Sequence, residues 1–382
     1  MQNISAIRAS VTKLCSNYPE EYWRKLDKIN GYPSEFVEEM NKEGFLSCLI
    51  PEEFGGSGLG LIEATAILEE VSFNGCNAGV CHAQMYVMAS ILKYGTYQQK
   101  KQYLPRISSG ELRLQSFGIT EPDSGTDTTN LRTTAKKLGN DYILNGQKVW
   151  ISRVEYSDLM VLLARTKAKD DCSKKTDGLS AFIIDLKKAV GNGLTIKPID
   201  TMINHHSCEL FLDDLVVSSE DLLGDENDGF KVVLDAMNAE RILIASECIG
   251  DARYFIKKAT EYASNRIVFD RPIGANQGVS FPLARAYANM VAAKLLVEKA
   301  ATLFDANEHC GAEANMCKLL ASEVSWFAGD TAMQTFGGFA FSKEYHIERK
   351  FRETRLYQIA PVSTNLILSY IAERELGLPR SF

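Results

Sequence analysis

The sequence lacks several features that would place the protein in a specialised class. None of its nine cysteines forms a CxxC pair, and they are scattered from Cys15 to Cys317. No uninterrupted apolar run approaches the roughly 18 residues that a membrane-spanning helix needs. The first residues lack a charged segment followed by an apolar core, the pattern of a secretory signal. We therefore expect reduced thiols, no membrane segment and a cytoplasmic location.

The sequence also has no excess of positive charge. Lys and Arg number 42 and Asp and Glu number 49, which gives a formal net charge of −7. A surface that binds polyanions needs clustered basic residues, so the composition argues against nucleic acid and anionic membranes as partners. Apolar residues make up 45% and charged residues 24%, which excludes intrinsic disorder and is typical of a globular protein.

What the sequence does contain falls into three zones. Residues 1–115 and 223–382 have apolar residues at helical spacing, whereas residues 116–222 have short apolar runs typical of strands. Between two of these runs lies Asn145-Gly146, which predicts a hairpin turn because both residue types tolerate positive φ. The order of helices, strands and helices predicts an α+β fold with a β domain between two helical domains.

The most unusual stretch is residues 117–127, which combines hydroxyls, acids, a proline and a glycine directly after an apolar run. Such a turn can expose backbone N–H groups and hydroxyls to a polar ligand, although a plain turn between strands fits the spacing too. Trp150 and Ser152 follow at the end of the expected hairpin. A tryptophan beside a hydroxyl could flank a flat aromatic cofactor, but Trp150 alone is more typical of a core.

Several motifs stand in an order and at a spacing that one family shares. They are Ile50-Pro51-Glu52-Glu53-Phe54-Gly55-Gly56, Gln99-Lys100-Lys101-Gln102-Tyr103-Leu104-Pro105, Ile119-Thr120-Glu121-Pro122 with Gly125-Thr126-Asp127, Asn145-Gly146-Gln147-Lys148-Val149-Trp150-Ile151, Phe336-Gly337-Gly338 and Phe351-Arg352-Glu353. With them the sequence resembles the acyl-CoA dehydrogenase family over nearly the whole chain. The resemblance implies an N-terminal helical domain (1–115), a middle antiparallel β barrel (116–222) and a C-terminal four-helix bundle (223–382).

The resemblance also implies FAD as the cofactor and assembly as a homotetramer or homodimer. The positions that match the family's cofactor-binding residues are Phe117, Ile119, Thr120, Thr126, Trp150, Ile151, Ser152, Arg266, Phe269, Gln277, Gln334, Gly337, Gly338, Ser363 and Asn365. Thr120 would hydrogen-bond the flavin, and Ser152 would do so in place of the family's usual threonine. Arg266 and Phe269 would reach the FAD of a neighbouring subunit, where a guanidinium can pair with pyrophosphate.

The catalytic base is expected at an unusual position. Most family members have a glutamate near the C-terminus, but the matching residue here is Pro361, which cannot take a proton. A minority of the family, including isovaleryl and long-chain enzymes, has its glutamate at a position that matches Glu240. Removal of an α-proton needs such a base, so the resemblance identifies Glu240 as catalytic. Without the resemblance, a glutamate early in a helix would be explained by the helix dipole.

The resemblance also implies four substrate-binding residues and the reaction. The substrate-binding positions are Thr126, Asn238, Arg241 and Ala360. Arg241 would contact the CoA portion, and Ala360 replaces a bulkier aromatic, which predicts tolerance of a branched or bulky acyl group. The implied activity is oxidation of an acyl-CoA thioester to the 2,3-enoyl-CoA in fatty acid metabolism, with electrons passed to an electron-transfer flavoprotein.

Two other functions fit the same fold. A flavin-dependent monooxygenase is the first, and Glu240 argues against it because such relatives usually lose the base. A non-catalytic flavin-binding relative that binds nucleic acid is the second, and the net charge of −7 argues against it. His205-His206 has no third ligand at a known metal spacing, so we expect a solvated turn there and no metal.

Overall fold

The computed structural model describes residues 2–380. Contacts within the chain divide it into two compact units. The helical unit contains the described residues up to Phe36, then Gly60–His82, and the chain from Asn238 onward. The sheet unit contains Val37–Leu59 and Ala83–Met237. The division into three domains at residues 115 and 222 stays a prediction.

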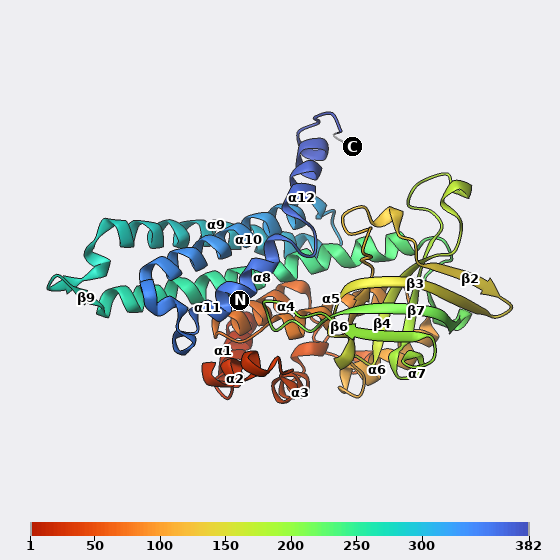
Figure 1. Cartoon of the computed structure of the whole chain (residues 1–382), viewed down its shortest axis with the longest axis horizontal. Coiled ribbons are helices and arrows are strands. Elements are labelled where there is room, and N and C mark those ends of the chain that lie inside the picture. The colour runs from red at the N-terminus through yellow and green to blue at the C-terminus, as the bar shows by residue number, and fades with distance from the viewer. Residues whose placement is uncertain (1, 381–382) are drawn as a thin grey trace. The chain divides into compact units, whose positions relative to one another are not determined.

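The helical unit is built mainly from long helices. Its elements are α1 (Gln2–Cys15), α2 (Glu20–Ile29), the start of α3 (Ser34–Lys42), α4 (Leu61–Phe73), α8 (Gly229–Asn265) from residue 238, α9 (Gln277–Asp305), α10 (Gly311–Phe336), α11 (Ile347–Arg355) and α12 (Thr364–Tyr370). Two short strands, β9 (Ile267–Val268) and β10 (Arg271–Pro272), connect α8 to α9. The helices α8, α9 and α10 run alongside one another (Figure 1).

Small side chains recur on the buried sides of α9 and α10. Buried alanines recur every seven residues on both helices: Ala286, Ala293 and Ala300 on α9, and Ala314, Ala321 and Ala328 on α10. A seven-residue repeat keeps one side of a helix facing its partner, and alanine allows the two backbones to approach closely. The predicted helical C-terminal region is confirmed.

The start of α4 is attached to the end of α9 by one carboxylate. Asp305 accepts hydrogen bonds from the backbone N–H groups of Leu61 at 2.7 Å and Ile62 at 3.0 Å. These donors have no partner inside α4, so Asp305 acts as a cap supplied from another helix. A Cβ at Gly60 would lie 2.4 Å from Asp305 Oδ2, which explains why glycine precedes the helix.

The sheet unit combines helices with one mixed sheet. Its main elements are α5 (Gly79–Tyr94), α6 (Tyr97–Ser108), β1 (Leu114–Gly118), β2 (Thr134–Leu138), β3 (Asp141–Ser152), β4 (Leu159–Arg165), β5 (Leu179–Asp185), β6 (Leu194–Pro198), β7 (Ser207–Ser218) and β8 (Leu222–Leu223). The strand order is β6-β7-β3-β2-β4-β5-β8, with β1 beside β4. Both β1 and β2 run parallel to β4.

The predicted middle β domain is present, but it is an open mixed sheet and not the expected antiparallel β barrel. Among the described residues, the two end strands β6 and β8 pair with β7 and β5 and not with each other, so the sheet is open. Because β8 has only two residues, it offers little edge for closure. Apolar runs in a sequence predict strands but contain no information about whether the two edges meet.

The predicted hairpin turn at Asn145-Gly146 is also wrong. Strand β3 continues through both residues, and the chain instead turns between Leu138 and Asp141. At Gly146 a Cβ would lie 2.5 Å from Thr133 Oγ1, so this glycine permits close approach of a neighbouring segment. The pairing of β3 with β7 also shifts register between Leu144 and Gly146, which is a bulge and not a turn.

Apolar side chains of the sheet form the core of this unit. Tyr142 and Phe182 meet edge to face with ring centroids 5.0 Å apart, and Leu144, Leu162 and Leu210 are fully buried around them. This packing fixes the strands that lead to the candidate site. No helix within residues 2–380 combines the length and the apolar character required to cross a membrane.

Candidate active site

The sheet unit brings the two predicted cofactor-binding stretches together. The backbone N–H of Val149 donates to the carbonyl of Thr120 at 2.9 Å. The Ser116 hydroxyl donates to the carbonyl of Ser152 at 3.2 Å. The end of β1 and the end of β3 are therefore neighbours, although they are separated by some 30 residues in the sequence. Phe117 and Thr120 are partly accessible there.

Trp150 is exposed and does not belong to the core. The β3–β7 ladder shifts register between Lys148 and Ile151, and Trp150 lies in this bulge with φ of 62°. Positive φ is strained for a bulky side chain and is typically kept where function requires it. The indole is 58% exposed, whereas the adjacent Ile151 is buried. An exposed ring held by a rigid strand is suited to contact a flat ligand.

A buried ion pair fixes the loop that follows Thr120. The Lys148 ammonium donates to Glu121 Oε1 at 2.8 Å and to the carbonyl of Ile119 at 3.1 Å. The Glu121 carboxylate also accepts from the backbone N–H groups of Arg132 and Thr133, at 2.6 and 3.0 Å. Burial opposes ionisation of Glu121, but Lys148 and these donors hold its pKa below its usual range. Burial lowers the pKa of Lys148 to about 8.

His206 is buried and His205 is partly buried and hydrogen-bonded, so the predicted solvated turn is wrong. His205 lies 3.0 Å from Ser152 Oγ through Nε2 and 3.1 Å from an Arg153 guanidinium nitrogen through Nδ1. His206 is buried and meets the Tyr156 ring edge to face at 4.8 Å. No motif in the sequence connects His205 or Arg153 with Ser152. In contrast, Thr126 is exposed in its loop.

In the helical unit, Glu240 lies on α8 among buried polar side chains. Glu240 is only 7% exposed, and the neighbouring Arg241 is also buried. Arg241 donates to Asn238 Oδ1 at 2.6 Å, so two predicted substrate-binding residues are in contact. Burial lowers the pKa of Arg241, and the charge of Glu240 acts in the opposite direction.

The loop that contains Pro361 is held from two sides. On α10, the buried Lys318 ammonium donates to the carbonyl of Val362 at 2.7 Å. From α8, Glu247 accepts from the hydroxyl of Tyr357 at 2.9 Å. Burial lowers the pKa of Lys318 to about 8, opposed by the charges of Cys248 and Glu240. Lys318 was not singled out from the sequence, because a lysine within a helix is usually exposed.

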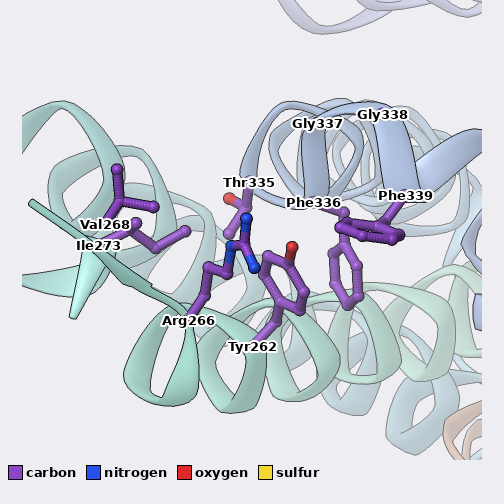
Figure 2. Close-up of a pocket in the computed structure, with 9 residues that line it drawn as sticks. All are labelled: Tyr262, Arg266, Val268, Ile273, Thr335, Phe336, Gly337, Gly338 and Phe339. Carbon is purple, nitrogen blue, oxygen red and sulfur yellow. The ribbon is translucent and has the colours of Figure 1, made fainter.

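A pocket of about 510 Å³ lies at the end of α8 and α10 (Figure 2). It is lined by Tyr262, Arg266, Val268, Ile273, Thr335, Phe336, Gly337, Gly338 and Phe339. Arg266, Gly337 and Gly338, three of the predicted cofactor residues, are therefore gathered in one place. Gly337 has φ of 59°, and a Cβ at either glycine would meet nothing within 4 Å. The backbone is thus open to close approach by a ligand beside a cationic side chain.

Other predicted cofactor residues lie outside this pocket. Phe269 is 94% exposed, and Gln277, Gln334 and Asn365 are exposed as well. Ser363 accepts from the backbone N–H of Leu366 at 3.3 Å and so caps α12. Ala360 is partly buried beside Pro361.

Each unit by itself has residues that suit a part of FAD. In the helical unit, the Arg266 pocket provides a cation and backbone without side-chain obstruction, which a diphosphate needs. In the sheet unit, Trp150, Thr120 and Ser152 provide the exposed flat surface and the hydroxyl donors that a flavin ring needs. Within residues 2–380 no group of three or more His, Cys, Asp or Glu side chains is arranged to hold a metal ion.

Comparison with known families places the chain unambiguously. The acyl-CoA dehydrogenase N-terminal, middle and C-terminal domain families match residues 2–111, 116–215 and 227–376. Acyl-CoA dehydrogenase FadE12 of Mycobacterium tuberculosis is 35% identical over 381 residues, covering 99% of this chain and 97% of that protein. CarC, a subunit of the caffeyl-CoA reductase-Etf complex of Acetobacterium woodii, is 33% identical, with 91% and 93% covered.

A solved structure agrees with these relatives. The glutaryl-coenzyme A dehydrogenase complex with glutaryl-CoA superposes with a TM-score of 0.92 at 30% identity, covering 100% of this chain and 97% of the other. The shared domains, the sequence identity and the fold agree on one family. This chain is an enzyme of the acyl-CoA dehydrogenase family.

Proposed function

We propose that the protein is an FAD-dependent dehydrogenase that converts an acyl-CoA thioester to the 2,3-enoyl-CoA. The observation that supports this most strongly is the buried Glu240 on α8, combined with Pro361 at the position where most relatives have their base. A carboxylate kept from water is suited to accept a proton from the carbon next to a thioester. FAD, when bound, supplies the acceptor for the hydride that leaves the neighbouring carbon.

The other predicted site residues would bind the substrate and the cofactor for that proton transfer. Arg241 and Asn238, which contact one another, would bind polar groups of the substrate close to Glu240, and Thr126 would contact its pantetheine arm. Thr120, Trp150 and Ser152 would hold the flavin ring. Arg266 would reach the diphosphate of a neighbouring subunit's FAD, with Gly337 and Gly338 as further contacts. Ala360 would leave room for a branched or bulky acyl group because it replaces a larger side chain.

The electron partner and the oligomeric state are also part of the proposal. CarC is named as part of a complex with an Etf, so we propose an electron-transfer flavoprotein as the electron partner. We also propose a homotetramer or homodimer. An exposed apolar stripe on α9 supports it, formed by Phe281, Tyr287, Val291 and Leu295. Exposed contiguous apolar surface is unusual on a monomer and typically marks an interface.

The test that separates this proposal from a monooxygenase is direct reduction by substrate. FAD-loaded protein is mixed anaerobically with a panel of straight, branched and aryl acyl-CoA thioesters, and flavin absorbance is followed by stopped flow. A dehydrogenase loses its yellow colour with at least one thioester and no other reductant. Persistence of oxidised flavin across the whole panel, with bleaching only by an external reductant, would favour the monooxygenase.

The same assay tests the base. Glu240→Gln keeps the size of the side chain but cannot accept a proton, so we expect FAD binding to be retained and flavin reduction to slow by about 10²-fold or more. The control is Glu261→Gln, which changes an exposed glutamate farther along α8 and should reduce at the parent rate. Equal rates for Glu240→Gln and the parent would exclude Glu240 as the base.

A further inference from the structure

Ser152, His205 and Arg153 form a hydrogen-bonded chain in the sheet unit. Ser152 Oγ lies 3.0 Å from His205 Nε2, and His205 Nδ1 lies 3.1 Å from an Arg153 guanidinium nitrogen. These hydrogen bonds connect the end of β3 to the segment just before β7, because Ser152 pairs with Ser207 in the ladder between these strands.

The chemistry of Arg153 decides which nitrogen of His205 has the proton. A guanidinium has donors only and stays protonated in proteins, so His205 Nδ1 must accept the hydrogen bond. Neutral imidazole with an accepting Nδ1 has its hydrogen on Nε2. The Nε2–H group therefore donates to Ser152 Oγ. Only this tautomer satisfies both contacts, since a protonated imidazole would set two donors against each other at Arg153.

The direction of these hydrogen bonds determines whether the Ser152 hydroxyl can donate to a ligand. Because Ser152 Oγ accepts from His205, its own hydrogen is free to point to an acceptor elsewhere. The surrounding backbone is also held in place. Ser116 donates to the Ser152 carbonyl at 3.2 Å, and the Arg153 N–H donates to the His206 carbonyl at 2.8 Å. Arg153 itself is buried, with φ of 56°.

We infer that His205, oriented by Arg153, is a positioning residue that sets the Ser152 hydroxyl as a hydrogen-bond donor towards the flavin ring. This inference rests on the proposed function, because it takes the acceptor to be FAD. A donor aimed at the ring withdraws electron density and so favours electron uptake by the flavin. The side chains of His205 and Arg153 need not touch the cofactor to have this effect.

The first test needs no cofactor. The protein is labelled with ¹⁵N-histidine and has five histidines. The signal of His205 is identified because it is lost in His205→Gln. Long-range ¹H–¹⁵N correlations then distinguish the two tautomers. We expect His205 to be neutral with hydrogen on Nε2. Hydrogen on Nδ1, or on both nitrogens, would overturn the inference whatever the protein catalyses.

The second test measures the reduction potential of the bound flavin. His205→Leu removes both hydrogen bonds, whereas His205→Gln retains one donor and one acceptor. We expect His205→Leu to make reduction about tenfold less favourable, equal to about 30 mV lower for a two-electron couple, and His205→Gln to stay near the parent. The visible spectrum of the oxidised flavin should shift in the Leu variant only.

A double-mutant cycle with Ser152→Ala makes the assignment specific. If His205 acts through the Ser152 hydroxyl, His205→Leu has no further effect on the potential in the Ser152→Ala background. An equal shift in both backgrounds, or no shift in either, would refute the positioning role. A parent protein that binds no FAD would instead refute the proposed function, and the tautomer measurement would still stand on its own.

Discussion

At the scale of single residues, the helical unit buries several ionisable side chains. Glu240, Arg241 and Lys318 are all buried in the helical unit, where a charge is costly unless it is paired. Lys318 donates to the carbonyl of Val362 and experiences the charge of Glu240. Lys318 is therefore the residue that contacts the loop around Val362 and also experiences the charge of the proposed base.

The stability of the protein should depend on Lys318 at alkaline pH. Its pKa is about 8 in the folded protein and 10.5 as an ordinary lysine, so between these values the unfolded chain binds more protons. Stability from this group must therefore rise as pH increases from 8 towards 10.5. We expect the free energy of unfolding of Lys318→Met to rise less between pH 8 and pH 10 than that of the parent, measured with urea. Lys13→Met, at an exposed lysine, is the control, and equal slopes for all three proteins would contradict the assignment.

Gly338 offers a variant that should affect cofactor binding without affecting folding. A Cβ there meets nothing within 4 Å of protein, so Gly338→Ala should change the free energy of unfolding by less than about 0.5 kcal/mol. It should weaken FAD binding about tenfold, because the methyl group fills space on the ligand side of the backbone. Titration of apoprotein with FAD measures this. Unchanged affinity would show that the cofactor does not approach this glycine.

At the scale of elements, the ends of strands and helices place the site residues. The bulge in β3 exposes Trp150, and the buried pair of Lys148 and Glu121 fixes the loop that follows β1. Because Lys148 on β3 holds Glu121 in the loop, the position of the adjacent Thr120 depends on this ion pair.

Breaking that pair from one side should be more harmful than removing it. Glu121→Leu leaves the buried Lys148 ammonium without its carboxylate, and we expect a loss of about 3–5 kcal/mol in the free energy of unfolding. Glu121→Leu combined with Lys148→Met should lose clearly less, because no unpaired charge remains. Urea unfolding of the parent and both variants measures the difference. A double variant less stable than Glu121→Leu would show that the pair itself provides the stability.

The sequence predicted some elements well and others poorly, for physical reasons. Helical spacing in the C-terminal region corresponds to α8, α9 and α10, because amphipathic periodicity reflects burial directly. The hairpin at Asn145-Gly146 failed because glycine there serves close packing against Thr133. The closed barrel failed because pairing of the sheet edges depends on tertiary structure.

The candidate site shows the same division. Arg266, Gly337 and Gly338 were predicted from family motifs, and the structure gathers them in one pocket. His205 could not be predicted, because its contact with Ser152 exists only through the register of β3 against β7. No motif in the sequence brings His205 and Ser152 together, because they are 53 residues apart.

For the molecule as a whole, the apolar stripe on α9 predicts association with further copies of the chain. Leu295 is central to this prediction because it is exposed on the same side of the helix as Val291 and Tyr287. We expect light scattering to show a dimer or tetramer for the parent and a smaller species for Leu295→Glu. Leu138→Glu, at an exposed leucine on β2, should leave the mass unchanged. A monomeric parent would contradict the proposed assembly.

Removal of the α-proton by Glu240 can be followed in isolation, without hydride transfer. A 3-thia-acyl-CoA deuterated at C2 can lose its α-deuteron but has no hydride to give from position 3. With FAD-loaded parent protein in ordinary water, mass spectrometry should show deuterium washing out of C2, and with Glu240→Gln the washout should slow by about 10²-fold or more. Washout at the same rate in both proteins would show that another group is the base.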